Sequence, residues 1–273
     1  MLGKLIKFEF RAVTKTLLLI NSFTVMLTVI GCLTFVSPMW EIPSEYTFFL
    51  AFSSVMVYYL AVLAISIFTV VYLGVRFYRN LYTDEGYLMH TLPVTPRELI
   101  LSKLFTAVCW SLITTLCIVF SLIALLGSAY LKFGVEELGD VHELFANLSE
   151  LTMGVYSMTL SGTCVYVLIS LVVGSFQAIL MIYAAISLGQ LFQKHKILGA
   201  VLSYVGFYFA TQILEMIFMI PKYISFFSMD FLYADMGSFM RYEMNAGIII
   251  SLIGAGAYYF ISEMMMRKKL NLD

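Results

Sequence analysis

The sequence has little charge. Asp, Glu, Lys and Arg make up only 12% of its 273 residues, whereas 61% are apolar by the AVILMFWYC count. Soluble domains carry about a quarter charged residues. The composition therefore excludes an ordinary soluble domain and predicts an integral membrane protein. Because the net charge is only −1, nothing in the total charge indicates a nucleic-acid partner.

Cysteine is also scarce. The four cysteines are Cys32, Cys109, Cys117 and Cys164; all lie in apolar stretches, and no two have the C-x-x-C spacing of metal ligands. Thiols in such stretches are typical of small packing residues. The sequence therefore predicts neither a disulfide framework nor a metal site.

Two motifs of enzymes are missing. No G-x-x-x-x-G-K-[ST] phosphate loop occurs, so this chain is not expected to bind ATP. His142-Glu143 lacks the second histidine of the H-E-x-x-H zinc motif. We therefore expect a chain that is not an enzyme and holds no cofactor of its own.

Six apolar stretches are long enough, or nearly long enough, to cross a bilayer, which takes about 20 helical residues. They are residues 16–36, 47–75, 104–131, 151–193, 197–220 and 246–262. The fourth stretch is about twice the required length, so we expect its outer part, from Leu151 to about Gly162, to form a separate segment that is interrupted at Ser161 and Gly162. The expected fold is an all-α integral membrane domain of six spans over residues 1–273.

The basic residues are concentrated on one side of these spans. With both termini in the cytoplasm of a multi-pass protein of the cell membrane, 13 of the 16 Lys and Arg residues lie inside, and only Lys132, Lys222 and Arg241 lie outside. The positive-inside rule favours this orientation. Residues 1–15 place apolar side chains at helical spacing with basic ones between them, which predicts an amphipathic interfacial helix before the first span.

The polar run between spans two and three, residues 76–98, contains a helix start. Thr95-Pro96-Arg97-Glu98 matches the capping box, with Thr95 as N-cap, Pro96 at the first helical position and Glu98 reaching back to the Thr95 amide. Upstream, residues 77–89 place aromatic and apolar side chains on the cytoplasmic side. We interpret them as a docking surface for a soluble partner; an interfacial helix resting on membrane lipids is the alternative.

The layout of these features resembles a known family. A basic interfacial helix, six spans, the Asp84-to-Leu88 element DEGYL followed by Thr91-Leu92-Pro93, and a short basic loop at 193–196 resemble the permease subunits of type-2 ABC exporters. Small six-span members without a fused ATPase are similar to bacterial peptide exporters, including those of phenol-soluble modulins. The resemblance spans the whole chain in layout and is most specific at these two short elements.

This resemblance implies a coupling helix between spans two and three that docks on a separate cytoplasmic ATP-binding subunit, where ATP and Mg are bound. It also implies a second permease copy, most simply a homodimer, and export of a hydrophobic or amphipathic peptide along a path between the copies. The implied docking residues are Arg79, Leu81, Tyr82, Asp84, Glu85, Gly86, Tyr87, Leu88, Lys194 and His195. An ATP-independent secondary carrier or channel, or a membrane immunity or scaffold protein, is the alternative.

Span five carries a polar and aromatic stripe. Tyr204, Tyr208, Thr211, Gln212 and Glu215 recur at steps of one, three and four residues. We interpret them as lining the transport path, since a carboxylate inside a membrane is a functional candidate. Hydrogen bonding between helices, or snorkelling of Glu215 to lipid headgroups, are the alternatives. Residues 221–245 are expected to form either an outer lid or a plain aromatic belt.

Overall fold

A computed structural model of the chain describes residues 2–37, 45–83, 86, 94–134, 141–192, 194–228 and 236–268. In this part of the chain all regular structure is helical, and six helices are long and apolar enough to cross a membrane. The predicted all-α fold with six spans is thereby confirmed, and the helices indicate a multi-pass membrane protein.

The helices follow one another with short connections. In chain order they are α1 (Leu2–Val36), α2 (Glu45–Tyr82), α4 (Pro96–Ala129), the short π-helical turn η2 (Tyr130–Gly134), α5 (Val141–Tyr156), α6 (Leu160–Gly189), α7 (Lys196–Ser228) and α8 (Met236–Lys268). All except η2 and α5 are among the six candidate spans.

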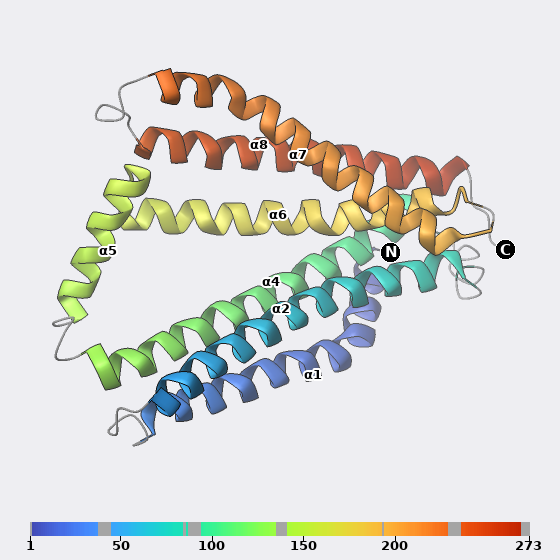
Figure 1. The fold of residues 1–273 in the computed structure, drawn as a ribbon. Coiled ribbons are helices and arrows are strands. Elements are labelled where there is room, and N and C mark those ends of the chain that lie inside the picture. The colour runs from blue at the N-terminus through green and yellow to red at the C-terminus, as the bar shows by residue number, and fades with distance from the viewer. Residues whose placement is uncertain are drawn as a thin grey trace.

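The helices form two groups (Figure 1). α1, α2 and α4 lie together, α6, α7 and α8 lie together, and the two groups separate toward the end where α5 crosses between them. The most extensive packing within the groups joins α1 to α4 and α6 to α8, while α4 and α2 both contact α6. Both termini lie at the opposite end. We call that end of the bundle the terminal end, and the end with α5 the divergent end.

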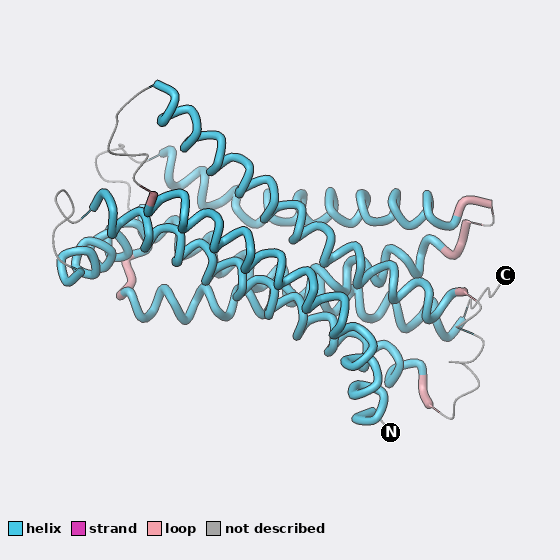
Figure 2. Tube along the Cα trace, turned by 90° about the horizontal axis from the view of Figure 1, so that it is seen from below, coloured by secondary structure: helices cyan, strands magenta, loops and turns pink. Residues whose placement is uncertain are grey.

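Two helices extend beyond the predicted spans. Residues 2–15 are helical, but they continue into the first span within α1; Figure 2 shows the first turns of α1 running at a steep angle to the rest. α2 continues past the expected end of its span at Val75 as far as Tyr82. It does so because Phe77 and Leu81 extend its buried face. The first part of the predicted coupling segment is therefore the end of α2, and residues 84–85 and 87–93 lie outside the described residues.

The capping box at the start of α4 is confirmed. The Thr95 hydroxyl accepts a hydrogen bond from the Glu98 amide at 3.4 Å, and the Thr95 amide donates to Glu98 Oε2 at 3.0 Å. Pro96 occupies the first helical position. α4 therefore begins where the sequence predicts it, well before the apolar part of the span.

The fourth apolar stretch is divided into two helices, as predicted, but earlier in the chain than Ser161 and Gly162. α5 ends at Tyr156, Ser157 has a positive φ of 49°, and Thr159 caps α6 by accepting a hydrogen bond from the Gly162 amide. Ser157 lies against α8, where a side chain at Gly237 would overlap it. Gly162 lies within the first turn of α6 and is not the break.

The predicted outer segment 221–245 is mostly an extension of two spans. α7 continues through Pro221 to Ser228, and α8 begins at Met236. Phe239 of α8 packs against Tyr223 and Phe226 of α7, with ring centroids 5.3 and 5.0 Å apart. These three aromatic residues thus join α7 to α8 at the divergent end, and residues 229–235 lie outside the described part.

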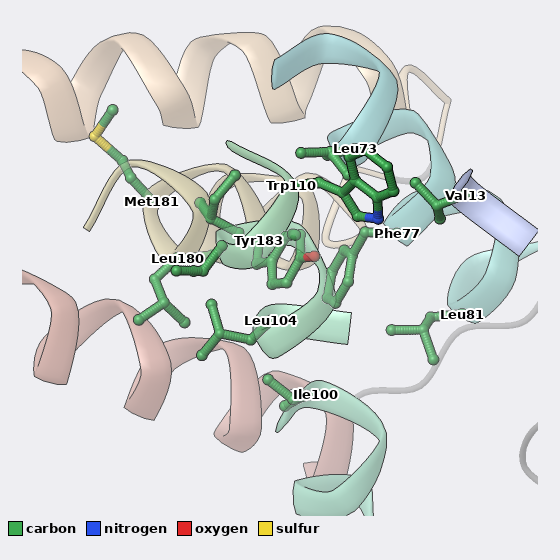
Figure 3. Packing of buried hydrophobic residues seen from close by; sticks show 14 of the residues in the cluster. Val13, Leu73, Phe77, Leu81, Ile100, Leu104, Trp110, Leu180, Met181 and Tyr183 are labelled. Carbon is green, nitrogen blue, oxygen red and sulfur yellow. The ribbon is translucent and has the colours of Figure 1, made fainter. Parts of the chain in front are cut away.

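The largest hydrophobic core lies toward the terminal end. Figure 3 shows Tyr183 of α6 beside Phe77 of α2, with Leu104 and Trp110 of α4 around them. The rings of Phe77 and Tyr183 stack with centroids 3.7 Å apart and planes inclined by 9°. This stack joins the two helix groups where they meet.

Hydrogen bonds between side chains supplement packing along the spans. Such bonds are effective between helices in lipid because water does not compete for them. They join Asn21 to Thr114 (α1 to α4), Tyr58 to Ser121 (α2 to α4), Tyr166 to Asn245 (α6 to α8) and Thr211 to Tyr258 (α7 to α8).

The cap at Thr95 gives a first testable prediction. Replacing Thr95 by Ala should destabilise the protein by about 1 kcal/mol, because the first turn of α4 loses a partner for its amide groups. The measurement is the thermal unfolding midpoint of the detergent-solubilised protein. Ser22→Ala, which removes an exposed hydroxyl bonded only to its own helix at Leu19, is the control and should change the midpoint little. Equal midpoints for the two variants would contradict the prediction.

Candidate functional site

A buried carboxylate joins three helices at the terminal end. Glu9 of α1 is only 4% exposed. Its Oε2 accepts hydrogen bonds from Nε and Nη2 of Arg76 in α2, both at 3.1 Å. Its Oε1 accepts from Nζ of Lys103 in α4 at 2.5 Å and from Nδ2 of Asn80 at 3.3 Å. We call these four residues the Glu9 network.

The network is closed to ligands. The side chains of Glu9 and Lys103 are both almost fully buried, and the adjoining cavity of about 10 Å³ has at most the space of one water. A buried charge without its partner is strongly unfavourable, so each member holds the others in position. The Glu9 network therefore positions the start of α1 against α2 and α4, rather than forming a substrate site.

Sequence analysis missed this residue, although a signal was present. Glu9 falls four residues before Val13 and eight before Leu17, both of which are buried. An acid within the apolar stripe of an amphipathic helix indicates a buried partner of opposite charge. Its partners are Arg76 and Lys103. They could not be identified from the sequence, because they lie in distant segments that meet only in the folded protein.

A second carboxylate joins α4 to α8 at the same end. Glu263 Oε1 accepts hydrogen bonds from Arg97 Nε at 2.6 Å and is 2.9 Å from Arg267 Nη2. Glu263 is largely buried, whereas both arginines are more than half exposed. Exposed cations are screened by water, so this contact contributes less to stability than the Glu9 network.

Two of the predicted docking residues are not on the surface. Leu81 is 0% exposed and Tyr82 is 3% exposed. The Tyr82 hydroxyl lies 2.9 Å from the Ser187 hydroxyl of α6, so Tyr82 fastens α2 to α6. The expectation that these two side chains are exposed for docking is wrong, because α2 continues as a helix that buries Leu81 in the hydrophobic core and Tyr82 against α6.

Other docking residues are accessible. Arg79, Lys194 and His195 are exposed, whereas Gly86 is buried and donates its amide proton to the Thr83 carbonyl at 2.7 Å. Asp84, Glu85, Tyr87 and Leu88 lie outside the described residues. The exposed part of the predicted surface is therefore reduced, within the described chain, to Arg79, Lys194 and His195.

A hollow of about 740 Å³ brings together the two segments that were predicted to dock. Tyr78, one residue before Arg79 on α2, lines it together with residues 194–198 and Val201 at the start of α7. These segments are far apart in sequence and share one depression at the terminal end. We call it the cationic hollow, because Lys194, His195 and Lys196 lie along it.

An apolar groove of about 560 Å³ adjoins this hollow. It runs between α2, α6 and α7 and is lined by Ser66, Ile67, Val70, Val71, Gly74, Val75, Ile182, Ala185, Ile186, Ile197, Ala200, Val201 and Tyr204. Several of these side chains are half exposed or more. We call it the α2–α7 groove; a concave, mostly apolar lining is typical of sites for small apolar ligands.

The predicted stripe on α7 is divided between two faces. Tyr204, Tyr208 and Gln212 are exposed and follow one another at steps of four, and Glu215 is half-buried close to them, accepting a hydrogen bond from Gln212 Nε2 at 3.0 Å. Thr211 differs from them. It is buried and lies 2.8 Å from the Tyr258 hydroxyl of α8, so it joins helices and is not on the exposed stripe.

Other chemistry is limited in the described part of the chain. No three His, Cys, Asp or Glu side chains there come close enough to hold a metal, and the four cysteines are free thiols.

Comparisons of the chain with known protein families, with characterised proteins and with solved structures found no match. The geometry and the residues of the chain are therefore the basis for assigning a function.

The Glu9 network gives a second prediction. Glu9→Gln should destabilise the protein by about 3–5 kcal/mol, because it leaves the buried Lys103 without an acidic partner. Lys103→Gln should cost less, because Arg76 still pairs with Glu9. The double variant should lose much less than the sum, since the Lys103 charge is removed together with the Glu9 charge. Denaturant unfolding in detergent micelles measures all three.

A matched control is Arg97→Gln, which removes a cation that is 60% exposed and should change the stability little, because water screens its contact with Glu263. Strictly additive losses in the double variant, or losses no larger than that of the control, would show that the Glu9 network does not hold the helices together.

Proposed function

We propose that this protein is the transmembrane subunit of an ATP-driven exporter in the cell membrane. A separate cytoplasmic subunit binds ATP and Mg, and a second permease copy completes the transporter as a homodimer. The cargo is a hydrophobic or amphipathic peptide that moves out of the cell.

The orientation of this proposal follows from charge. The terminal end carries the two chain ends, the end of α2 and the connection from α6 to α7, and most Lys and Arg residues belong to these segments. Basic residues are retained on the cytoplasmic side of bacterial and other cell membranes. We therefore place the terminal end in the cytoplasm and the divergent end outside.

The cationic hollow is the observation that carries the proposal. A subunit that drives transport must contact more than one helix to move them relative to each other. The cationic hollow places the end of α2 and the start of α7 where one partner can contact both. Arg79 lies next to Tyr78 and is exposed, as are Lys194 and His195. With Asp84 and Glu85 of the adjoining sequence, these residues call for a partner that presents acidic groups to Arg79 and Lys194 and basic groups to the two acids.

Movement at this surface would reach the spans through buried contacts. The Glu9 network couples α2 to α1 and α4, and the stack of Phe77 on Tyr183 couples α2 to α6. Closely packed helices move as units rather than deforming continuously. A push on the end of α2 would therefore change the separation of the two helix groups, which is widest at the divergent end.

The stripe on α7 is the proposed contact surface for the transported peptide. Tyr204, Tyr208, Gln212 and Glu215 place phenol, amide and carboxylate groups among the apolar side chains in the middle of α7. Such a face suits an amphipathic peptide between two copies of the chain, because polar side chains in the bilayer usually face protein or a water-filled path.

Docking can be tested by co-purification. We expect an ATP-binding subunit encoded beside this gene to co-purify with the tagged permease after co-expression. Asp84→Lys with Glu85→Lys, and separately Lys194→Glu with His195→Glu, should lower its recovery by about tenfold or more, since like charges across an interface are strongly unfavourable. Lys4→Glu with Lys7→Glu, also exposed at the terminal end, is the matched control. Failure of any ATP-binding subunit to co-purify with the wild type would contradict the proposed function.

The role of the α7 stripe can be tested by transport. Glu215→Gln should slow export of the peptide by about tenfold or more, because a hydrogen bond to a charged group contributes about 1.5–3 kcal/mol. Glu243→Gln, an exposed acid near the outer end of α8, is the control and should export at the wild-type rate. A Glu215→Gln protein that is expressed and exports every substrate at the normal rate would remove Glu215 from the path.

A further inference from the structure

The cationic hollow and the α2–α7 groove are one continuous depression. Ile197 and Val201 line both. They lie one turn apart on α7 and both are exposed, so the two parts meet along this face of α7. We propose that this depression binds an anionic phospholipid of the inner leaflet, with the headgroup phosphate in the hollow and an acyl chain in the groove.

The groove is built to accept an acyl chain. At its floor a Cβ on Gly74 would lie only 2.9 Å from Cγ2 of Ile182, so the absence of a side chain lets α2 approach α6 closely. Val71 of α2 and Ile186 of α6 add apolar surface beside this crossing. The volume of about 560 Å³ lies in the range of about 300–1,000 Å³ found for small-ligand sites.

The hollow is built to accept an anion. Lys194, His195 and Lys196 lie along it with the phenol of Tyr78, and no Asp or Glu is among the described residues that line either part. Ammonium, imidazole and phenol groups all donate hydrogen bonds to phosphate oxygens. Basic pockets between helices at the cytoplasmic face are typical sites for anionic lipid headgroups.

The apolar α2–α7 groove favours a phospholipid over a soluble anion as the ligand. A free phosphate or phosphate ester would occupy the hollow alone and leave the groove uncovered, although Val71 and Val201 are more than half exposed there. A phospholipid covers both parts at once and already lies in the membrane beside α2 and α7. The inference needs no ATP-binding subunit, but Lys194 and His195 belong to the proposed docking surface too, so the test uses the chain alone.

Native mass spectrometry of the delipidated, detergent-solubilised full-length chain tests the site. The protein is titrated with phosphatidylglycerol or with phosphatidylcholine that has the same acyl chains. We expect the wild type to bind phosphatidylglycerol more tightly than phosphatidylcholine. The double variant Lys194→Gln with His195→Gln should bind phosphatidylglycerol about fivefold or more weakly, because a basic residue beside a lipid phosphate contributes about this factor to the affinity. Val201→Trp, which fills the shared wall, should weaken binding of both lipids.

Two controls match these variants. Lys4→Gln with Lys7→Gln removes two exposed cations from the same end of the bundle, and Ile213→Trp enlarges an exposed side chain elsewhere on α7. Both should bind phosphatidylglycerol like the wild type, and circular dichroism should show equal helicity for all variants.

Several results would overturn the inference. They are equal affinity for the two lipids, site variants that bind like their controls, and displacement of phosphatidylglycerol by glycerol 3-phosphate at similar concentration, which would assign the hollow to a soluble anion. Loss of the lipid site together with normal co-purification of the ATP-binding subunit would leave the proposed function intact.

Discussion

The contact between Glu9 and its two cations is the constraint on which the rest of the structure depends. A carboxylate that is almost completely buried must be held by cations, and Arg76 and Lys103 come from two different spans. This requirement fixes the first turns of α1 against α2 and α4. A segment that its composition would allow to rest on the membrane surface is thereby built into the protein.

The same end of the bundle holds nearly everything that a partner or ligand could use. Glu263 draws α8 toward the start of α4, and Tyr82 and Phe77 hold α2 against α6. With these contacts in place, the end of α2 and the start of α7 lie close enough to line the cationic hollow. The two helix groups separate only toward the divergent end, where α5 crosses between them. A terminal end that is held together and a divergent end that is wider fit the proposal that the protein is driven from the terminal end.

Length and hydropathy were sufficient to predict the six spans, because crossing a bilayer demands long uninterrupted helices of apolar residues. Local chemistry was sufficient for the start of α4, where Thr95, Pro96 and Glu98 act within one turn. It was insufficient for the break before α6. The sequence suggested Ser161 and Gly162, whereas the chain breaks at Ser157, which has a positive φ and lies against Gly237 of α8.

Contacts between distant segments could not be predicted. Leu81 and Tyr82 stand in a run that ends in charged residues, and only the unbroken continuation of α2 shows that both are buried. The partners of Glu9 are 67 and 94 residues away along the chain, so periodicity could indicate a buried acid without identifying its cations. The cationic hollow likewise depends on two chain segments meeting in space. Of the candidate site, the exposed cations and most of the α7 stripe were foreseen, and their arrangement was not.

The most direct test of this account measures how firmly the start of α1 is held. Spin labels on cysteines at positions 7 and 105, both exposed, report the distance from α1 to α4 in a background where the four native cysteines are replaced. We predict one narrow distance distribution for the protein in lipid nanodiscs and a broad one when Glu9 is changed to Gln. A distribution that is broad with Glu9 present, or that does not respond to its loss, would contradict the account.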